Sequence, residues 1–159
     1  MKTYIVLDLE TTGFDANADQ VIEIAAIKFQ GSTIIETFHH LINPGVPIPP
    51  MVSHITGLKA EDLLHAPPFE EVEQQLITFL EDVPIIGHNI GFDVGFLNSK
   101  GLKLQNPLYD TLQLAPILLP GLPSYSLDTL TRLLKIQHEE RHRAMSDTKA
   151  NLELFYILL

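Results

Sequence analysis

The chain is 159 residues long and 45% hydrophobic, so it can bury the core of a single domain over residues 1–159. The absence of cysteine excludes disulfide bonds, thiol chemistry and zinc sites built on thiolates, and a formal net charge of −10 argues against broad binding to a nucleic-acid backbone. No apolar run approaches the ~20 residues of a membrane span and no signal-peptide core precedes the first predicted strand, so we expect a soluble, cytoplasmic protein that does not bind membranes.

Three antiparallel strands are predicted at the start of the chain. The apolar residues 4–10 indicate a buried strand that ends in a turn. Residues 21–29 and 33–38 flank a Gln-Gly-Ser turn, a pattern typical of a β-hairpin. The proline-rich stretch 43–50 is expected to be an ordered surface connection, because its prolines exclude a helix or a central strand.

Helices and short strands are predicted in the rest of the chain. Apolar residues recur at helical spacing over 69–80, and the short run 84–88 predicts a buried strand. The later predicted elements are a helix over 92–97, a short strand at 108–109, a helix over 127–134 and a last helix ending at 159. No element is predicted between residues 111 and 123, where prolines interrupt the chain. This order predicts an α/β fold with a mixed sheet flanked by helices.

Asp8 and Glu10 stand at the end of the first predicted strand. Side chains two apart on a strand share a face, so both carboxylates point the same way. At an effective dielectric of ~20 and a separation of ~4 Å they repel each other by roughly 4 kcal/mol, a cost that a divalent cation would convert into binding energy. The alternative interpretation is that both acids form the solvated end of an edge strand.

Two further stretches carry isolated acids. Asp93 follows His88-Asn89, and it either contributes another carboxylate or caps the next helix. His142 and Asp147 are five residues apart, about 500° on one helix, so they can face one point only if a break separates them. We therefore expect His142 in the loop before the last helix and Asp147 in the early turns of that helix. The alternative is that His142 is a solvated loop residue.

Three other acids are expected to have structural roles. Asp110 is interpreted as the cap of the following helix or as a residue that orients a neighbour. Asp128 and Glu23 are interpreted in the same way.

Together, the three stretches resemble the motifs of the DnaQ-like 3′-to-5′ exonucleases, in the DEDDh branch named for four acids and a histidine. Residues 8–13 are similar to the first motif, 88–93 to the second and 142–147 to the third. Lesser similarities to family signatures lie between the motifs, at 54–57, 66–69 and 124–127. The resemblance covers nearly the whole chain.

The resemblance implies a ribonuclease H-like fold and an enzyme that releases 5′-mononucleotides from the 3′ end of single-stranded DNA, in proofreading or repair. It implies two Mg²⁺ or Mn²⁺ ions ~3.5 to 4 Å apart, bound through oxygen atoms. Their ligands would be Asp8, Glu10, Asp93 and Asp147. Asp8 would bridge the ions, and His142 would be the general base that takes a proton from the attacking water.

The resemblance also implies a site for the terminal nucleotide. It would be formed by the backbone groups of Thr11 and Thr12 and by His54, Ile55 and Asn89. Basic residues gather near the third motif, and we expect a few of them to contact phosphate. These residues are Arg132, Lys135, Arg141, Arg143 and Lys149.

Two alternatives stay open. One is a 3′-to-5′ exoribonuclease of the same fold, whose site would admit the 2′ hydroxyl. The other is a non-catalytic module that docks to a polymerase or helicase. Because the sequence stops at Leu159 without a glycine cap or polar tail, we also expect either a domain of a longer polypeptide or a last helix that contacts such a partner.

Overall fold

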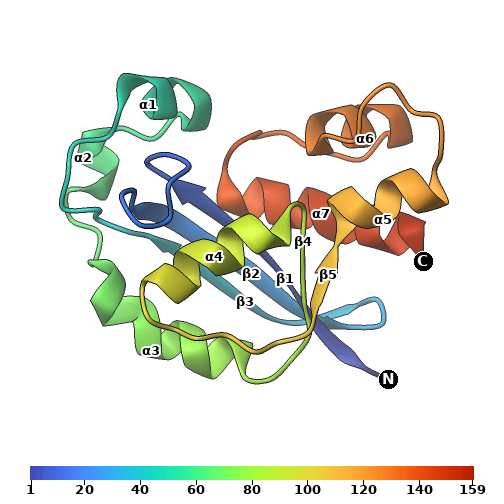
Figure 1. The fold of residues 1–159 in the computed structure, drawn as a ribbon, viewed down its shortest axis with the longest axis horizontal. Helices are drawn as coiled ribbons and strands as arrows, with labels where there is room; N and C mark the ends of the chain where they lie inside the picture. The colour runs from blue at the N-terminus through green and yellow to red at the C-terminus, as the bar shows by residue number, and fades with distance from the viewer.

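A five-stranded mixed sheet forms the centre of the protein in the computed structural model, which describes residues 1–159 (Figure 1). In spatial order the strands are β3 (Thr33–Leu41), β2 (Val21–Gln30), β1 (Thr3–Thr11), β4 (Ile85–Gly87) and β5 (Leu108–Asp110). β2 pairs antiparallel with both β1 and β3, whereas β4 and β5 run parallel to β1. The predicted α/β fold, with a mixed sheet that begins with three antiparallel strands, is confirmed.

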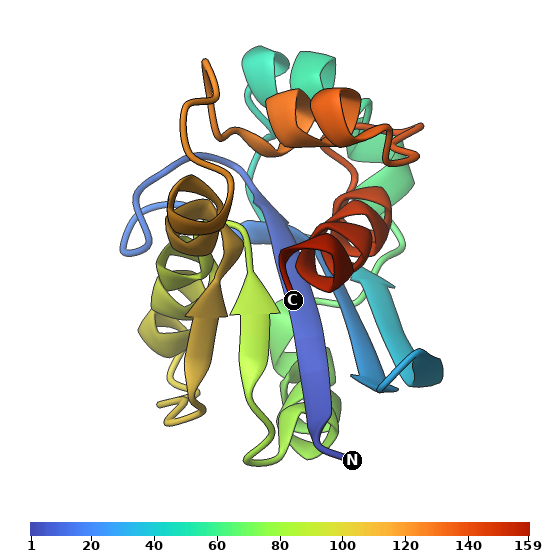
Figure 2. The same cartoon turned by 90° about the vertical axis from the view of Figure 1, so that its right-hand side faces the viewer.

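Helices cover both faces of the sheet. They are α1 (Pro50–Thr56), α2 (Ala60–Leu63), α3 (Phe69–Leu80), α4 (Ile90–Ser99), α5 (Thr111–Leu118), α6 (Leu127–Leu134) and α7 (Ala144–Leu158). α3 and α4 pack on one face and α7 packs on the other, while α5 and α6 pack against α7 (Figure 2). Figure 2 also shows α1 and α6 beyond the carboxyl ends of β1 and β4. None of the helices has the length and apolar character that a membrane crossing requires.

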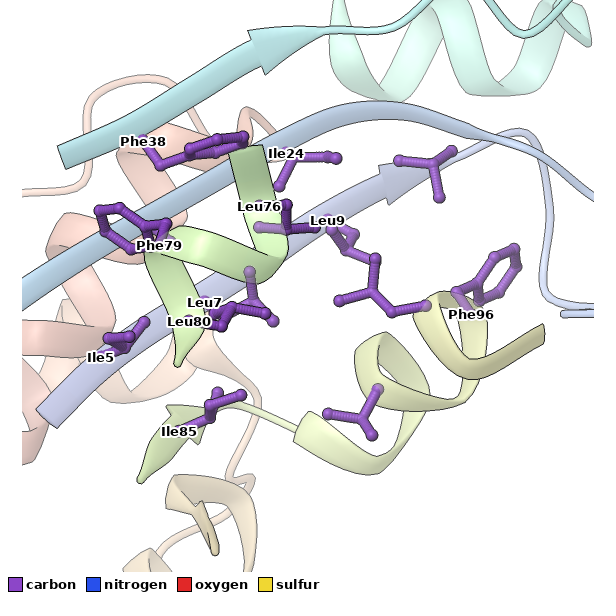
Figure 3. Close-up of a cluster of buried hydrophobic side chains, with 14 of the residues drawn as sticks. Ile5, Leu7, Leu9, Ile24, Phe38, Leu76, Phe79, Leu80, Ile85 and Phe96 are labelled. Carbon is purple, nitrogen blue, oxygen red and sulfur yellow. The ribbon is translucent and has the colours of Figure 1, made fainter. Parts of the chain in front are cut away.

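The alternation of side chains along β1 separates two cores and places the acids. The odd-numbered residues from Ile5 to Leu9 point toward α3 and α4, where they join the largest cluster of buried side chains (Figure 3). Val6 lies on the opposite face and packs in the cluster that contains α7. Burial of one such side chain contributes roughly 1.5–3 kcal/mol. Asp8 and Glu10 continue the series of Val6, so they lie on the α7 face.

Two helices near the prolines differ from the prediction. α1 begins at Pro50, inside the stretch expected to lack a helix, because a proline at the first helical position lacks only an amide hydrogen that has no partner there. α5 lies where no element is predicted and contains Pro116. The side chain of Asp110 caps its start, and the buried Ala115 packs against α6 and α7, which outweighs the hydrogen bond lost at Pro116. The short helix α2 was also not predicted.

Candidate active site

Three carboxylates converge at the carboxyl end of β1. Asp8, Glu10 and Asp147 each offer an oxygen atom that lies within 4.8 Å of those of the other two. Asp8 and Glu10 come from the α7 face of β1, and Asp147 comes from the first turn of α7. The structure therefore brings together three of the four expected acids.

Asp93, the fourth expected acid, lies beside this group but not within it. It is buried in the first turn of α4, and its Oδ1 accepts a hydrogen bond of 2.9 Å from the amide of Leu9. The N-cap of α4 is Asn89, so Asp93 binds β1 rather than capping its own helix. Among the neighbouring charges, that of Asp93 nevertheless has the largest effect on the pKa of Asp8, which it raises.

Burial and crowding raise the pKa values of these carboxyl groups. Loss of water and then the charges of the neighbouring acids, Asp93 first, raise the pKa of Asp8 well above its usual value of 3.8. Burial and the charge of Asp147 raise the pKa of Glu10 to about 9. Burial raises the pKa of Asp93 to about 8. It also raises the pKa of Asp147, although a hydrogen bond from His138 opposes this shift.

A divalent cation fits this arrangement. Oδ2 of Asp8 is buried without a hydrogen-bond partner, which is rare and unfavourable for a polar atom. The group offers carboxylate oxygens, the ligands that hard cations such as Mg²⁺ and Mn²⁺ prefer. A cation among them would relieve the mutual repulsion and supply the missing partner of Asp8.

His142 lies in the loop directly before α7, as its spacing from Asp147 predicts. Arg143 is the N-cap and the helix begins at Ala144, so the expected break falls between His142 and Asp147. His142 has a φ of 58°, in the left-handed region. Its backbone N lies 3.3 Å from Oδ1 of Asp147, while its imidazole is exposed and makes no hydrogen bond within the protein.

The buried Glu23, paired with the partly exposed Arg143, ties this turn to the sheet. Glu23 lies on β2 with 0% exposure, and its Oε2 is 2.9 Å from Nη2 of Arg143. Nε of Arg143 donates to the same oxygen at 3.0 Å, and the amide of Ala144 donates to Oε1. These contacts hold the two residues that follow His142. The structural interpretation of Glu23 is confirmed, and its role is to anchor the start of α7.

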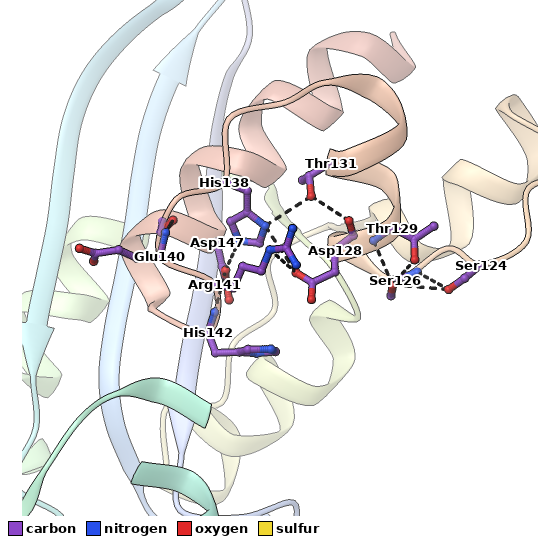
Figure 4. Close-up of polar contacts among 11 residues, drawn as sticks. Ser124, Ser126, Asp128, Thr129, Thr131, His138, Glu140, Arg141, His142 and Asp147 are labelled. Carbon is purple, nitrogen blue, oxygen red and sulfur yellow. Dashed lines mark hydrogen bonds and ion pairs between the residues drawn. The ribbon is translucent and has the colours of Figure 1, made fainter. Parts of the chain in front are cut away.

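His138 is a residue of the site that the motif resemblance does not include. Its side chain is 3% exposed, and its Nε2 lies 2.5 Å from Oδ1 of Asp147 (Figure 4). Its neighbours in the sequence, Gln137 and Glu139, are exposed polar residues. Nothing in the local pattern therefore marks His138 as buried, and only its closeness to the third motif could have drawn attention to it.

The two threonines of the first motif are engaged in the turn after β1. Thr12 is buried, and its amide donates to the carbonyl of Gln20 at 2.8 Å. The hydroxyl of Thr11 donates to the carbonyl of Gly13 at 2.6 Å. The amide of Thr12 is thus already paired within the protein, which leaves its carbonyl as the backbone group to consider for nucleotide binding.

The other expected nucleotide-binding residues lie around the same end of the sheet. His54 and Ile55 are exposed on α1, and Ile55 is 44% exposed. Asn89 is exposed at the start of α4, and its amide donates to Oδ1 of Asp110 at 2.8 Å. The same carboxylate accepts the amide of Leu112 at 2.9 Å, so the predicted capping role of Asp110 is confirmed.

Two of the five basic residues expected near phosphate already have acidic partners. Arg143 pairs with Glu23, and Nε of Arg141 lies 3.4 Å from Oδ1 of Asp128. The structure gives no ion pair to Arg132, Lys135 or Lys149. Lys135 and Lys149 line a surface hollow of about 940 Å³, but Asp8, Glu10 and Asp147 do not. The site is therefore identified by its chemistry.

Comparison with known proteins agrees with this geometry. Residues 5–155 match the family RNase_T, whose description is Exonuclease. The chain belongs to this exonuclease family. The matched range contains all the motif residues of this exonuclease, so the predicted resemblance and the predicted class of enzyme are confirmed.

The exonuclease is similar to DNA polymerase III subunit epsilon and to part of PolC-type DNA polymerase III. It is 35% identical over 162 residues to DNA polymerase III subunit epsilon of Aquifex aeolicus. The aligned region covers 99% of this chain and 80% of that protein. It is 41% identical over 158 residues to the PolC-type DNA polymerase III of Thermotoga maritima. This aligned region covers 96% of this chain and 12% of that protein. The chain thus spans about a tenth of the PolC-type relatives that it matches.

Solved structures share the fold of this exonuclease. Exonuclease X in complex with 5′ overhanging duplex DNA has a TM-score of 0.82 at 24% identity, over 98% of this chain and 90% of that chain. E. coli Exonuclease I in complex with a dT13 oligonucleotide has a TM-score of 0.84 at 22% identity, over 99% of this chain and 41% of that chain. The expected ribonuclease H-like fold is confirmed.

Proposed function

We propose that this chain is a two-metal-dependent 3′-to-5′ exonuclease that hydrolyses the terminal phosphodiester bonds of single-stranded DNA and releases 5′-mononucleotides, in proofreading or repair. The observation that carries the proposal is the meeting of Asp8, Glu10 and Asp147 within 4.8 Å, next to the buried Asp93 and the exposed His142. Two proteins of the same fold support a DNA substrate, because Exonucleases X and I were solved with DNA bound.

The four acids, Asp8, Glu10, Asp93 and Asp147, would hold two Mg²⁺ or Mn²⁺ ions. When bound, such a pair supplies the positive charge and Lewis acidity needed for attack by water on the phosphate and for departure of the 3′ oxygen. The contribution of the chain is to hold the carboxylates together at the end of β1. Because their pKa values are raised, the acids must give up protons on binding the ions.

His142 would take the proton of the attacking water. Histidine is the side chain most often used for this purpose. Its exposed imidazole has no partner in the protein, so it is free to turn toward a bound strand end. The backbone amide of His142 remains in contact with Oδ1 of Asp147, and the pair of Glu23 and Arg143 holds the turn before α7 in place.

The terminal nucleotide would lie between the first motif and α1. The exposed apolar side chain of Ile55 offers a surface for the base, and His54 lies beside it on the same helix. Backbone groups of Thr11 and Thr12, and Asn89 at the start of α4, would complete this site.

We also propose that the enzyme works with a polymerase, as a subunit or as part of a longer chain. The names of the relatives, DNA polymerase III subunit epsilon and PolC-type DNA polymerase III, support this association. A helicase partner is the alternative. Gel filtration of the enzyme with a purified polymerase or helicase of the same source would distinguish the two partners.

Digestion of single-stranded DNA labelled at its 5′ end tests the reaction. We expect a ladder of progressively shorter labelled products with Mg²⁺ or Mn²⁺ and none with a chelator. Asp8→Ala should abolish the ladder, whereas Glu70→Gln, a change of an exposed acid on α3, should leave it unchanged. Immediate release of a labelled mononucleotide would instead show the opposite polarity.

The two alternatives correspond to other results of this assay. Faster digestion of an RNA oligomer of matched sequence would make the enzyme an exoribonuclease. If the parent and Asp8→Ala give equal turnover, the chain is a docking module without this activity.

A further inference from the structure

A buried histidine links the carboxylate group to α6. His138 lies in the loop between α6 and α7, and its side chain is 3% exposed. Its Nε2 faces α7, 2.5 Å from Oδ1 of Asp147. Its Nδ1 faces α6, 3.6 Å from Oδ1 of Asp128 and 3.4 Å from Oγ1 of Thr131 (Figure 4). Each ring nitrogen therefore has a polar partner, and one partner is a residue of the active site.

Packing does not account for a histidine at this position. Apolar side chains already join α6 to α7, among them Leu130 and Leu154, both 0% exposed. Burial of an imidazole is unfavourable unless its nitrogens find partners, so an apolar side chain would fill the same space at lower cost. What a histidine adds here is a hydrogen-bond donor directed at Asp147.

That donor acts on the orientation of the Asp147 carboxylate. An ionised carboxylate only accepts hydrogen bonds, so Nε2 is the donor whenever Asp147 serves as a metal ligand. The backbone amide of His142 reaches the same oxygen, Oδ1, at 3.3 Å, and no protein donor reaches Oδ2. Two donors on one oxygen restrict rotation of the carboxylate and leave the other oxygen for a ligand.

The far side of the ring is also held. Oδ1 of Asp128, which faces Nδ1 of His138, lies 3.4 Å from Nε of Arg141. Asp128 is therefore fixed by an arginine from the same loop that carries His138. The contacts run from α6 through the loop to the first turn of α7, as Figure 4 shows.

We propose that His138 is a positioning residue that holds Asp147 in the orientation that binds a divalent cation, with Asp128 fixing the far side of the ring. This inference rests on the proposed function, and it assigns a role to a residue outside the three motifs. Removing a hydrogen-bond partner of a ligand side chain typically lowers metal affinity about 10- to 100-fold.

Mn²⁺ titration calorimetry of paired variants tests this role. Glutamine places its amide nitrogen near the position of Nε2, whereas the shorter asparagine does not reach Asp147. His138→Gln should bind Mn²⁺ within about threefold of the parent, and His138→Asn about 10- to 100-fold more weakly. At saturating Mn²⁺ the KM for DNA should be parental in both variants. His65→Asn, a change of an exposed histidine after α2, is the control and should match the parent.

Two results would overturn the positioning role. One is parental Mn²⁺ affinity in His138→Asn, and the other is an equal loss in His138→Gln and His138→Asn when both melt at the parental temperature. If His138→Asn does not fold, His138→Leu replaces it, with the same expected loss, because leucine fills the space without a donor.

Asp8→Ala separates this inference from the proposed function. If Asp8→Ala loses Mn²⁺ binding and DNA cleavage while His138→Asn binds Mn²⁺ like the parent, only the positioning role is wrong. If Asp8→Ala binds Mn²⁺ and cleaves DNA like the parent, the proposed function itself is wrong.

Discussion

The carboxylate of Asp93 accepts the amide hydrogen of Leu9 over a distance of 2.9 Å and so joins α4 to β1. β4 pairs with β1 only at Ile5 and Val6, so the amide of Leu9 lies beyond the end of β4. Asp93 occupies the place that a further strand residue would take. One side chain therefore completes the sheet and adds negative charge beside Asp8.

These two contributions of Asp93 can be separated by substitution. Asp93→Asn keeps an acceptor for Leu9 and removes the charge, so the fold should stay intact while metal-dependent hydrolysis falls by more than the ~10- to 100-fold expected for a residue that only orients a ligand. Asp93→Ala leaves a buried amide unpaired and should also lose about 1–3 kcal/mol of unfolding free energy. Urea unfolding without metal measures the difference, and equal stabilities of the two variants would contradict this explanation.

Without metal, the protein should become less stable as the pH rises. The folded-state pKa values of Glu10, about 9, and Asp93, about 8, lie above their usual values, and that of Asp8 is raised too. The folded state therefore keeps protons that the unfolded state releases. The free energy of unfolding is highest below about pH 4 and falls as the pH rises toward 9, by at most ~1.4 kcal/mol per pH unit for each group.

Urea unfolding in a chelator from pH 5 to 9 measures this slope. Asp8→Asn removes one of the interacting charges and should flatten the profile. A stability that rises with pH over this range in the parent would be the opposite of the expected sign.

Stabilisation by Mn²⁺ should increase with pH. The ion binds ionised carboxylates, so binding competes with the protons that the raised pKa values retain. At a concentration 100 times its dissociation constant a ligand stabilises the folded state by about 2.7 kcal/mol. We expect the rise in melting temperature at a fixed Mn²⁺ concentration to be larger at pH 8 than at pH 6. A rise of equal size at both pH values, or one that persists in Asp8→Ala, would count against this site.

The two members of the Glu23 and Arg143 pair should be unequal in their effect on stability. Arg143→Met leaves a carboxylate that is 0% exposed with the amide of Ala144 as its main remaining partner, and should cost about 3–5 kcal/mol. Glu23→Gln leaves a guanidinium whose side chain is 30% exposed and can reach water, so its cost should be smaller. Chemical denaturation of both variants checks this order, which a larger loss in Glu23→Gln would reverse.

The strands could be predicted from the sequence because their patterns are local. Apolar residues alternate or run continuously along β1 and β2, and the hairpin turn contains Gly31, whose φ of 58° suits glycine. α1 and α2 could not be predicted, since helices of seven and four residues leave too little periodicity to recognise. The sequence does not predict α5, because Pro116 argues against a helix there. In the folded chain the packing of Ala115 against α6 and α7 stabilises the helix despite this proline.

Part of the site follows from simple geometry. Strand alternation places Asp8 and Glu10 on one face, and the angle per helical residue requires the break before Asp147. The partners of His138 and the position of Asp93 outside the group of three acids depend on tertiary packing, which no local pattern records. Glu23 did carry a signal, since a charged residue inside an apolar strand needs a partner, but the sequence does not say which.

Crystals of the protein soaked in Mn²⁺ would show where the cations bind through their anomalous scattering. We predict two anomalous peaks, ~3.5 to 4 Å apart, in contact with carboxylate oxygens of Asp8, Glu10 and Asp147. Peaks only at other positions, or none at all with these carboxylates turned apart, would contradict the proposed site.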